Sequence, residues 1–527
     1  MTTADPAGGD SGRSHSGSRS LASRFSAPRL RAALRCRFGI DPRALAAFRV
    51  ALGVALLADL ALRARNLIAF YTDAGVLPRA LLAETYPVAA RLSLHALSGE
   101  ARAVALLFLA AAVAAVALAA GYRTRVATGV SLVLLASLQA RNPFVLNAGD
   151  TLLLQLLGAG LLCPLGARWS LDAVRGRSVG AEAEPASRAP SESGSRPATE
   201  RVAGPASTLL LTLVVVVYVS NAVEKLRGTA WPAGEAVERV FRLTYLHGPL
   251  GGLVPEWSAL LSAATYGWLA LLVASPLLIA AVGRVRVALA GTLLAAHLSM
   301  AFTLQIGVFS VISATALLPF FPPFVWDRVE RAVAPAADRL RSVASRRPFL
   351  TNPPTEGGPL RAVRDRAAVV VPVLAAVLLV ALVAWNGMAL GLVETPEPVA
   401  SAADPTEGGW DMFAPDPPST DALVLATATT ADGDRIDALY GDRVARDRPP
   451  SDARAYPTAR WRKLLTLLAD DPDPARVDPV LAHLCDRADA FTADGRIASV
   501  SLSAVDVDVE TGETRTETLG SRECRLA

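Results

Sequence analysis

Long apolar runs dominate the first 400 residues of the chain, and several approach the roughly 20 residues that an α-helix needs to cross a bilayer. Hydrophobic residues make up 52% of the 527 residues, which also favours a membrane protein with many spans. The pattern predicts an all-α polytopic membrane bundle. Nine transmembrane helices are expected, at about 44–62, 101–120, 124–140, 145–163, 206–223, 258–281, 285–303, 305–322 and 368–392.

The pattern changes near residue 400. VLATATT and RIDALYG alternate like two strands on either side of the turn DGD, and RIASVSLSAVDVDVETGETRTETLG is typical of a hairpin with its turn at TGE. Between these segments, ARWRKLLTLLAD and ARVDPVLAHLCDRADAF have helical periodicity. The sequence therefore predicts a small α+β domain at 400–527.

Polar stretches set the boundaries of the predicted membrane domain. Residues 1–40 are rich in Ser, Gly and Arg and are expected to form a disordered basic tail. A linker at 164–205 contains a Pro- and Ser-rich stretch, and a second linker is expected at 324–366, where arginines are frequent and no long apolar run occurs. The transmembrane domain is thus expected at 41–323, with a last helix at 367–393.

The distribution of arginine orients the predicted helices, because positively charged loops stay on the cytoplasmic side. The Arg-rich N-terminal tail should be cytoplasmic, and alternation from there places every Arg-rich connection on the same side. The C-terminal domain then lies outside a cell-membrane protein. Four connections, 66–79, 140–150, 220–234 and 297–305, are expected to meet on that outer face.

The formal net charge of +4 is the sum of a basic N-terminal part and an acidic C-terminal part. From Ser401 onward the chain has 24 acidic and 14 basic side chains and a net charge of −10, whereas the part before it carries +14. An acidic domain joined to an Arg-rich membrane part indicates two compartments and no nucleic-acid partner. The scarcity of lysine is typical of a high-GC, salt-adapted organism of the haloarchaeal type.

The four cysteines do not have the spacing of a metal site, and neither do the histidines, so no metal is expected. Cys36 lies in the N-terminal tail and Cys163 in the membrane part. Cys485 and Cys524 share the C-terminal domain, where they either form a disulfide in an oxidising exterior or are two unrelated small residues.

Lys225 departs from the composition of the chain, because only two of its 52 basic residues are lysines, the other being Lys463. Tyr218, Asn221 and Lys225 share one face of the helix that continues the span at 206–223. A desolvated lysine amine can lose its proton and act as a base, whereas an arginine guanidinium cannot. The alternative is that Lys225 only reaches toward the lipid headgroups.

Three further positions are candidates for a site. His297 lies inside an apolar stretch and either faces a cavity or bonds a neighbouring helix as a neutral imidazole. Asp150 opens a helix and has either a binding role or a favourable interaction with the helix dipole. Arg141, followed by Asn142, either binds an anion or ends its helix.

Several segments occur in an order that resembles the horizontally transferred transmembrane (HTTM) family, whose best-known member is the vitamin K-dependent gamma-glutamyl carboxylase. They are FRVALGVALLADLALRARN, FYTDAGVLPR, GYRTR, LQARNPFVLNAGD, SNAVEKLRGTAWPAG, WDMFAPDPP and ARWRKLL. The resemblance covers about residues 40–525, and the last two segments are similar to the short extracytoplasmic tail of prokaryotic members.

The resemblance implies a reduced quinone of the menaquinol type as cofactor, with Lys225 and His297 as catalytic residues. It departs from the carboxylase in two places, because Asn147 is followed by Ala148 instead of histidine, and about 120 residues replace the large lumenal part. A quinol-dependent deprotonation is the part of the mechanism that Lys225 alone can support. The candidate substrate- or quinol-binding residues are Tyr218, Asn221, Trp231, Asn147, Asp150 and Arg141.

Three functions are compatible with these features. The first is a quinol-dependent enzyme in the lipid bilayer that acts on an extracytoplasmic protein or peptide. The second is a non-catalytic assembly or substrate-handling protein that acts through its outer domain. The third is a transporter, against which the polar residues gather on one face and no helix pair broken by Gly or Pro stands out.

Overall fold

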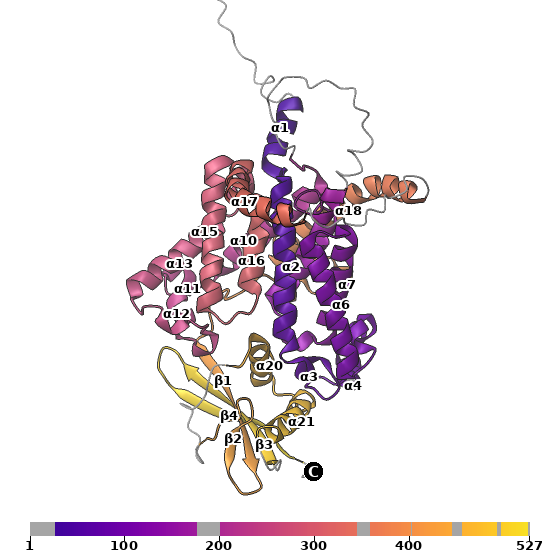
Figure 1. Cartoon of the computed structure of the whole chain (residues 1–527). Coiled ribbons are helices and arrows are strands. Elements are labelled where there is room, and N and C mark those ends of the chain that lie inside the picture. The colour runs from indigo at the N-terminus through magenta and orange to yellow at the C-terminus, as the bar shows by residue number, and fades with distance from the viewer. Residues whose placement is uncertain are drawn as a thin grey trace, which may run out of the picture.

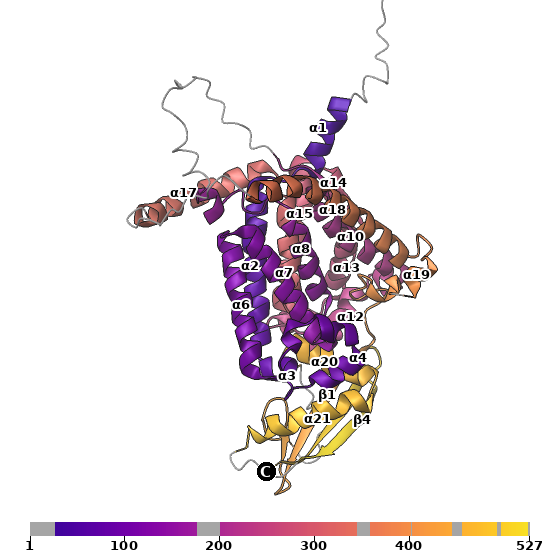
Figure 2. The same ribbon diagram turned by 90° about the vertical axis from the view of Figure 1, so that its right-hand side faces the viewer.

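A bundle of helices with a small sheet domain at one end forms the computed structural model, which describes residues 27–175, 201–344, 359–401, 403–444, 456–492 and 497–524 (Figure 1). Helix α1 (Ala27–Phe38) lies at the end of the bundle opposite the sheet. A view turned by 90° shows the same division along the long axis of the molecule (Figure 2).

Five helices in the described ranges are long and apolar enough to cross a membrane. By length and composition they could cross a membrane several times, which agrees with the coarser form of the prediction, a multi-pass membrane protein. They are α2 (Pro42–Ala64), α6 (Ala101–Ala120), α10 (Pro205–Arg227), α15 (Gly283–Thr303) and α18 (Pro359–Ala389), the apolar part of α18 being Ala368–Ala389.

The other predicted spans correspond to shorter or bent helices, so the number nine stays a prediction. Helix α7 (Thr124–Arg141) is not among the five, and α8 (Ala148–Leu161) and α13 (Ser258–Val273) have 14 and 16 residues. The stretch 305–322 contains α16 (Phe309–Leu317), whose nine residues rise only about 14 Å. That stretch is therefore not one continuous span.

Helix α17 (Pro323–Ala344) occupies part of the predicted 324–366 linker, and α18 begins within that linker at Pro359. The axis bends by 109° between the α16 region and α17, after the 3₁₀ turn η6 (Leu318–Phe320). Helix α17 consequently lies across the end of the bundle (Figure 2). Val325, Val329 and Val333 recur every four residues with charged residues between them, so α17 is an amphipathic helix. Such a helix has no long apolar run.

Two other predicted polar segments have different outcomes. Residues 27–38, which the sequence placed in a disordered tail, form helix α1; the earlier part of that tail lies outside the described residues. The Pro- and Ser-rich stretch of the 164–205 linker also lies outside them, except for its last residue.

Short helices connect the long ones, mostly at the end of the bundle that faces the sheet. They are α3 (Leu67–Tyr71), α4 (Arg79–Thr85), α5 (Pro87–Leu92), η2 (Leu94–Ala96), η3 (Pro143–Val145), α11 (Ala230–Ala233), α12 (Ala236–Arg242), η4 (Thr244–Leu246), η5 (Gly251–Leu253), α14 (Leu277–Ala280), α19 (Glu397–Ala400) and η7 (Pro405–Gly408).

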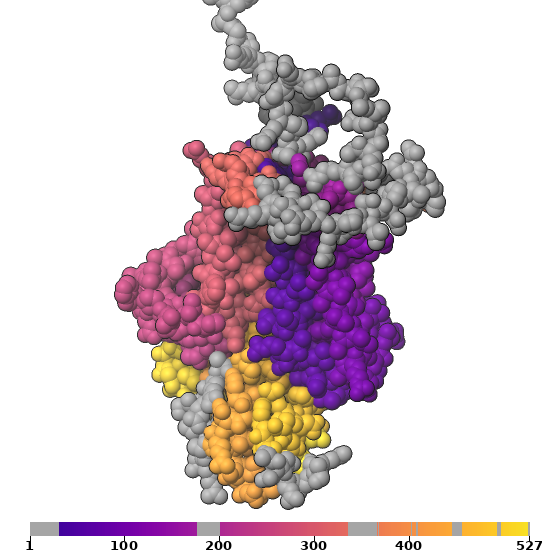
Figure 3. All heavy atoms as spheres, viewed as in Figure 1, coloured from indigo at the N-terminus to yellow at the C-terminus, as the bar shows by residue number. Residues whose placement is uncertain are grey.

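The C-terminal domain is a four-stranded antiparallel sheet in the order β2-β1-β3-β4, with two helices. Both predicted hairpins and both predicted helices are confirmed, and a disulfide joins Cys485 to Cys524. The space-filling view shows the domain packed against the end of the bundle (Figure 3). Its elements are β1 (Thr420–Thr430), β2 (Arg435–Asp437), α20 (Ala459–Asp470), α21 (Pro474–Asp489), β3 (Ile497–Asp508) and β4 (Thr514–Glu523).

A buried ion cluster holds helix α20 against the bundle. Arg460 donates to Asp59 at 2.9 Å and to Asp150 at 3.0 Å, while Arg63 pairs with both carboxylates from the opposite side. All four side chains are at least 90% buried. Two cations and two anions thus balance one another between the bundle and the C-terminal domain.

Each of the four connections that were expected on one face contacts a residue of the predicted C-terminal domain, 400–527. Their convergence at one end of the bundle is therefore confirmed, while the side of the membrane on which they lie stays a prediction. The contacts are Trp461 Nε1 to Asn66 Oδ1 at 3.1 Å, Arg460 Nη1 to Val145 O at 3.0 Å, Lys225 Nζ to Met412 O at 2.5 Å and Gln305 Nε2 to Tyr456 O at 2.9 Å.

Candidate functional site

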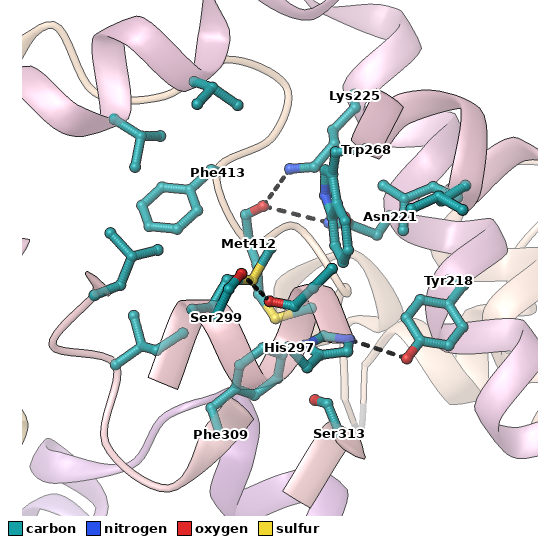
Figure 4. Close-up of a pocket in the computed structure, with 18 of the residues that line it drawn as sticks. Tyr218, Asn221, Lys225, Trp268, His297, Ser299, Phe309, Ser313, Met412 and Phe413 are labelled. Carbon is teal, nitrogen blue, oxygen red and sulfur yellow. Dashed lines mark hydrogen bonds between the residues drawn. The ribbon is translucent and has the colours of Figure 1, made fainter. Parts of the chain in front are cut away.

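Helix α10 presents Tyr218, Asn221 and Lys225 to one cavity, as their spacing predicted (Figure 4). Each side chain is buried, and Lys225 is only 1% exposed. The cavity has a volume of about 350 Å³ and a largely apolar lining from α10, α13, α15 and α16. His297 and Trp231 also line it, so five of the eight predicted site residues come together.

The Lys225 amine has unusual surroundings for a buried cation. Its Nζ donates to the Met412 carbonyl at 2.5 Å and lies 3.9 Å from the centre of the Trp231 ring. No carboxylate oxygen lies within 4.0 Å of it in the described part of the chain. A peptide oxygen and an aromatic face therefore replace the ion pair that a buried ammonium group usually has.

His297 bonds the neighbouring helix, as one of its two interpretations predicted, and also faces the cavity. Its Nε2 lies 3.0 Å from the Tyr218 hydroxyl, while its Nδ1 is buried without a hydrogen-bond partner. The rings of Trp268 and Phe309 pack around the imidazole at 5.4 and 6.1 Å between centroids. One ring nitrogen is thus without a hydrogen-bond partner among the described residues.

The segment 410–416, which we call the closing segment, covers the end of the cavity next to Lys225. Its main-chain carbonyls face donors from the bundle, as Figure 4 shows for Met412. Asn221 Nδ2 donates to Trp410 O at 2.9 Å, and Trp231 Nε1 donates to Phe413 O at 2.7 Å. Main-chain carbonyls from the residues that lead into the C-terminal domain therefore accept hydrogen bonds from three polar side chains of the cavity.

Asp416 anchors the far end of the closing segment. Its carboxylate accepts from the Thr229 amide at 2.9 Å and from the Ala230 amide at 2.7 Å. Partial burial raises the pKa of this carboxyl, but the hydrogen bonds outweigh burial and hold the pKa below its ordinary value. The anchor is consequently complete at neutral pH and is lost only as the pH falls through the lowered pKa.

We expect Asp416→Ala to loosen the closing segment by about 1 kcal/mol, because hydrogen bonds to a carboxylate are lost from a partly exposed site. Faster hydrogen exchange at the amides of Thr229 and Ala230 at pH 7 would measure this effect. The control is Asp404→Ala, which removes another exposed carboxylate that bonds only its own turn. Equal exchange in both variants would contradict the anchoring role.

The remaining three predicted site residues lie elsewhere. Asn147 caps helix α8, accepting from the Gly149 amide at 2.8 Å, and Asp150 belongs to the buried ion cluster. Arg141 is buried, donates to Leu77 O at 2.8 Å and lies 3.7 Å from Asp73. These residues share the end of the bundle with the Lys225 cavity but do not line it, and their binding role stays a prediction.

The sequence analysis missed several residues that shape the cavity. Met412 and Phe413 lie in the segment WDMFAPDPP, which entered only through the resemblance, and their carbonyl contacts have no signature in the sequence. Trp268 and Phe309 have the appearance of ordinary apolar helix residues. An aromatic residue inside a predicted span was the only available signal for them.

The cavity is open at the side of the bundle, between α13 and α15. Ala264 and Gly267 of α13 and Ser299 of α15 line it and are also exposed on the surface. A ligand dissolved in the membrane could therefore enter without passing the closing segment.

No protein-family model matches this chain, and comparison with curated proteins and with solved structures gives no match. The described residues form a helical bundle with five helices apolar and long enough to cross a membrane, a small antiparallel sheet domain and a buried lysine at an apolar cavity.

Proposed function

We propose that this protein is a membrane enzyme of the HTTM type, which binds a reduced quinone in the Lys225 cavity and uses Lys225 as a base. The single observation that carries the proposal is the burial of the Lys225 amine at the wall of an apolar cavity, without a carboxylate partner in the described ranges. A structural cation needs such a partner, whereas an amine that exchanges its proton does not.

The cavity residues fit a quinol of the menaquinol type. The apolar lining suits a ring and an isoprenoid tail, the lateral opening suits a lipid-soluble molecule, and the imidazole of His297 in the lining suits a ring hydroxyl. When bound, a reduced quinone supplies electrons and hydroxyl protons. Lys225 Nζ is the atom that would accept a proton, His297 and Tyr218 would orient the ring, and the closing segment would exclude water.

The proposed orientation places the N-terminus in the cytoplasm and the C-terminal domain outside the cell. The Arg-rich connections support it, and so does the disulfide between Cys485 and Cys524, because disulfides persist in oxidising compartments. An extracytoplasmic protein or peptide is then the expected substrate, in reach of the face that carries the closing segment.

The test uses purified full-length protein with reduced menaquinone and oxygen, and follows quinone epoxide by chromatography. We expect epoxide from the wild type and at least a tenfold loss in Gly267→Phe, because a Cβ at Gly267 meets no atom within 4 Å and the new ring can enter the cavity mouth. Gly129→Phe is the matched control, since Gly129 is equally open but lies on α7, away from the cavity.

The absence of epoxide from folded wild-type protein would contradict the proposal. A second candidate function would then be preferred, in which the chain is a non-catalytic assembly protein and Lys225 only secures the closing segment. The hydrogen bond from Lys225 to Met412 favours that alternative, because it already occupies the amine.

A further inference from the structure

The face of α10 that turns away from the Lys225 cavity forms the floor of a second cavity, which we call the lateral groove. Helices α8 and α18 form its walls, and its volume is about 730 Å³. Leu209 and Leu213 of α10, together with Leu378 and Leu382 of α18, give it an apolar surface. Leu378 is 41% exposed, so the groove is open toward the surrounding membrane.

The charged residues of the groove lie at one end. Its lining on α8 extends from Ala148 to Ala159, a distance of about 16 Å at 1.5 Å per residue. Asp411 and Lys463 line the end nearest the C-terminal domain. An apolar channel along the helix axis with charges at one end matches the shape and polarity of a lipid whose acyl chain lies parallel to the helices.

Three polar groups in the groove have no partner. The Lys463 ammonium and the Asp411 carboxylate make no hydrogen bond or ion pair with any described residue, although both lie at the same mouth. The side-chain oxygen of Gln155, on the α8 wall, is buried and also unpartnered. The two charged side chains are exposed and therefore accessible to a ligand at this mouth. Buried polar atoms normally have a partner, so the Gln155 oxygen points to a missing donor.

We propose that the lateral groove binds a phospholipid with a zwitterionic headgroup. Its phosphate bonds Lys463, its headgroup ammonium bonds Asp411, and an acyl chain lies along α10 between α8 and α18. A quinone does not fit this mouth equally well, because it carries neither charge. The proposal does not depend on the function proposed for the Lys225 cavity, because lipid retention is measured without quinone, although the closing segment borders both sites through Asp411 and Met412.

Native mass spectrometry of the detergent-purified full chain tests this, with phosphatidylethanolamine and phosphatidylglycerol of identical acyl chains. We expect one phosphatidylethanolamine to be retained with about fivefold preference, the size of an exposed ion pair. Asp411→Asn should remove the preference between the two lipids, and Lys463→Gln should weaken both. Arg515→Gln, which removes an equally exposed positive charge on β4, should change neither.

A steric variant separates the groove from its charged mouth. A Cβ at Gly158 meets no atom within 4 Å, so Gly158→Phe should fill the groove and abolish retention of both lipids, whereas Gly129→Phe should not. Equal retention in wild type, Lys463→Gln and Gly158→Phe would overturn the proposal. A preference for phosphatidylglycerol would also overturn it, because that lipid has no headgroup ammonium to bond Asp411. Retention of detergent only would overturn it as well.

Discussion

The variant Lys225→Arg is expected to lose at least about 100-fold in quinol conversion, which is the lower range of what a positioned general base contributes. Arginine retains the positive charge and can still donate to Met412, but its guanidinium does not give up a proton. The measurement is the rate of epoxide formation by purified protein. Lys463→Arg makes the same substitution at the only other lysine, outside the cavity, and should retain the wild-type rate.

Hydrogen-exchange protection at the closing segment is the control that the structure is unchanged in this variant. Lys225→Arg and wild type should show the same hydrogen exchange at the Thr229 and Ala230 amides, which donate to Asp416 at the far end of the closing segment and not to the partner of Lys225. An active Lys225→Arg variant would contradict a proton-transfer role for the amine. Conversely, loss of both activity and protection would mean that Lys225 acts through the position of the segment.

Removing Arg460 is expected to cost about 3–5 kcal/mol of stability, because it leaves an uncompensated negative charge between Asp59 and Asp150. Thermal unfolding of Arg460→Ala would show the loss. Arg443→Ala should change stability by less than about 1 kcal/mol, since its ion pair with Asp434 is long at 3.6 Å and its side chain is 85% exposed.

A second variant distinguishes charge balance from simple loss of packing. Combining Arg460→Ala with Asp150→Asn removes one cation and one anion, and leaves the Arg63 and Asp59 pair intact. We expect the double variant to recover part of the lost stability. If it is less stable than Arg460→Ala alone, the charge of the cluster is not what holds the C-terminal domain.

Much of the fold could be predicted because its signals are local. The apolar run at 44–62 and the alternation of VLATATT each reflect a period that a helix or strand imposes on neighbouring residues. The stretch 305–322 could not be predicted in the same way. Its mainly apolar composition suggested one span, whereas Pro319, Pro322 and Pro323 mark the point at which the helix ends and the axis bends.

The candidate site likewise has a part that could be predicted from local sequence and a part that could not. The spacing of Tyr218, Asn221 and Lys225 fixes one face of a helix, so their common cavity was predictable. Asn147 and Asp150 were placed correctly at the same end of the bundle, but the rotation of α8 relative to α10 was not available from sequence. That rotation turns Asn147 toward the lateral groove.

The closing segment also determines when the site is complete during synthesis of the protein. Met412 is 187 residues beyond Lys225, and chains are made from the N-terminus, so the ribosome finishes the whole bundle core before the acceptor of the Lys225 amine exists. A nascent chain halted before the last helix carries the lysine but not its cover. The amine therefore reaches its final surroundings only after the closing segment has been made and has docked, which makes assembly of this site a late event in biogenesis.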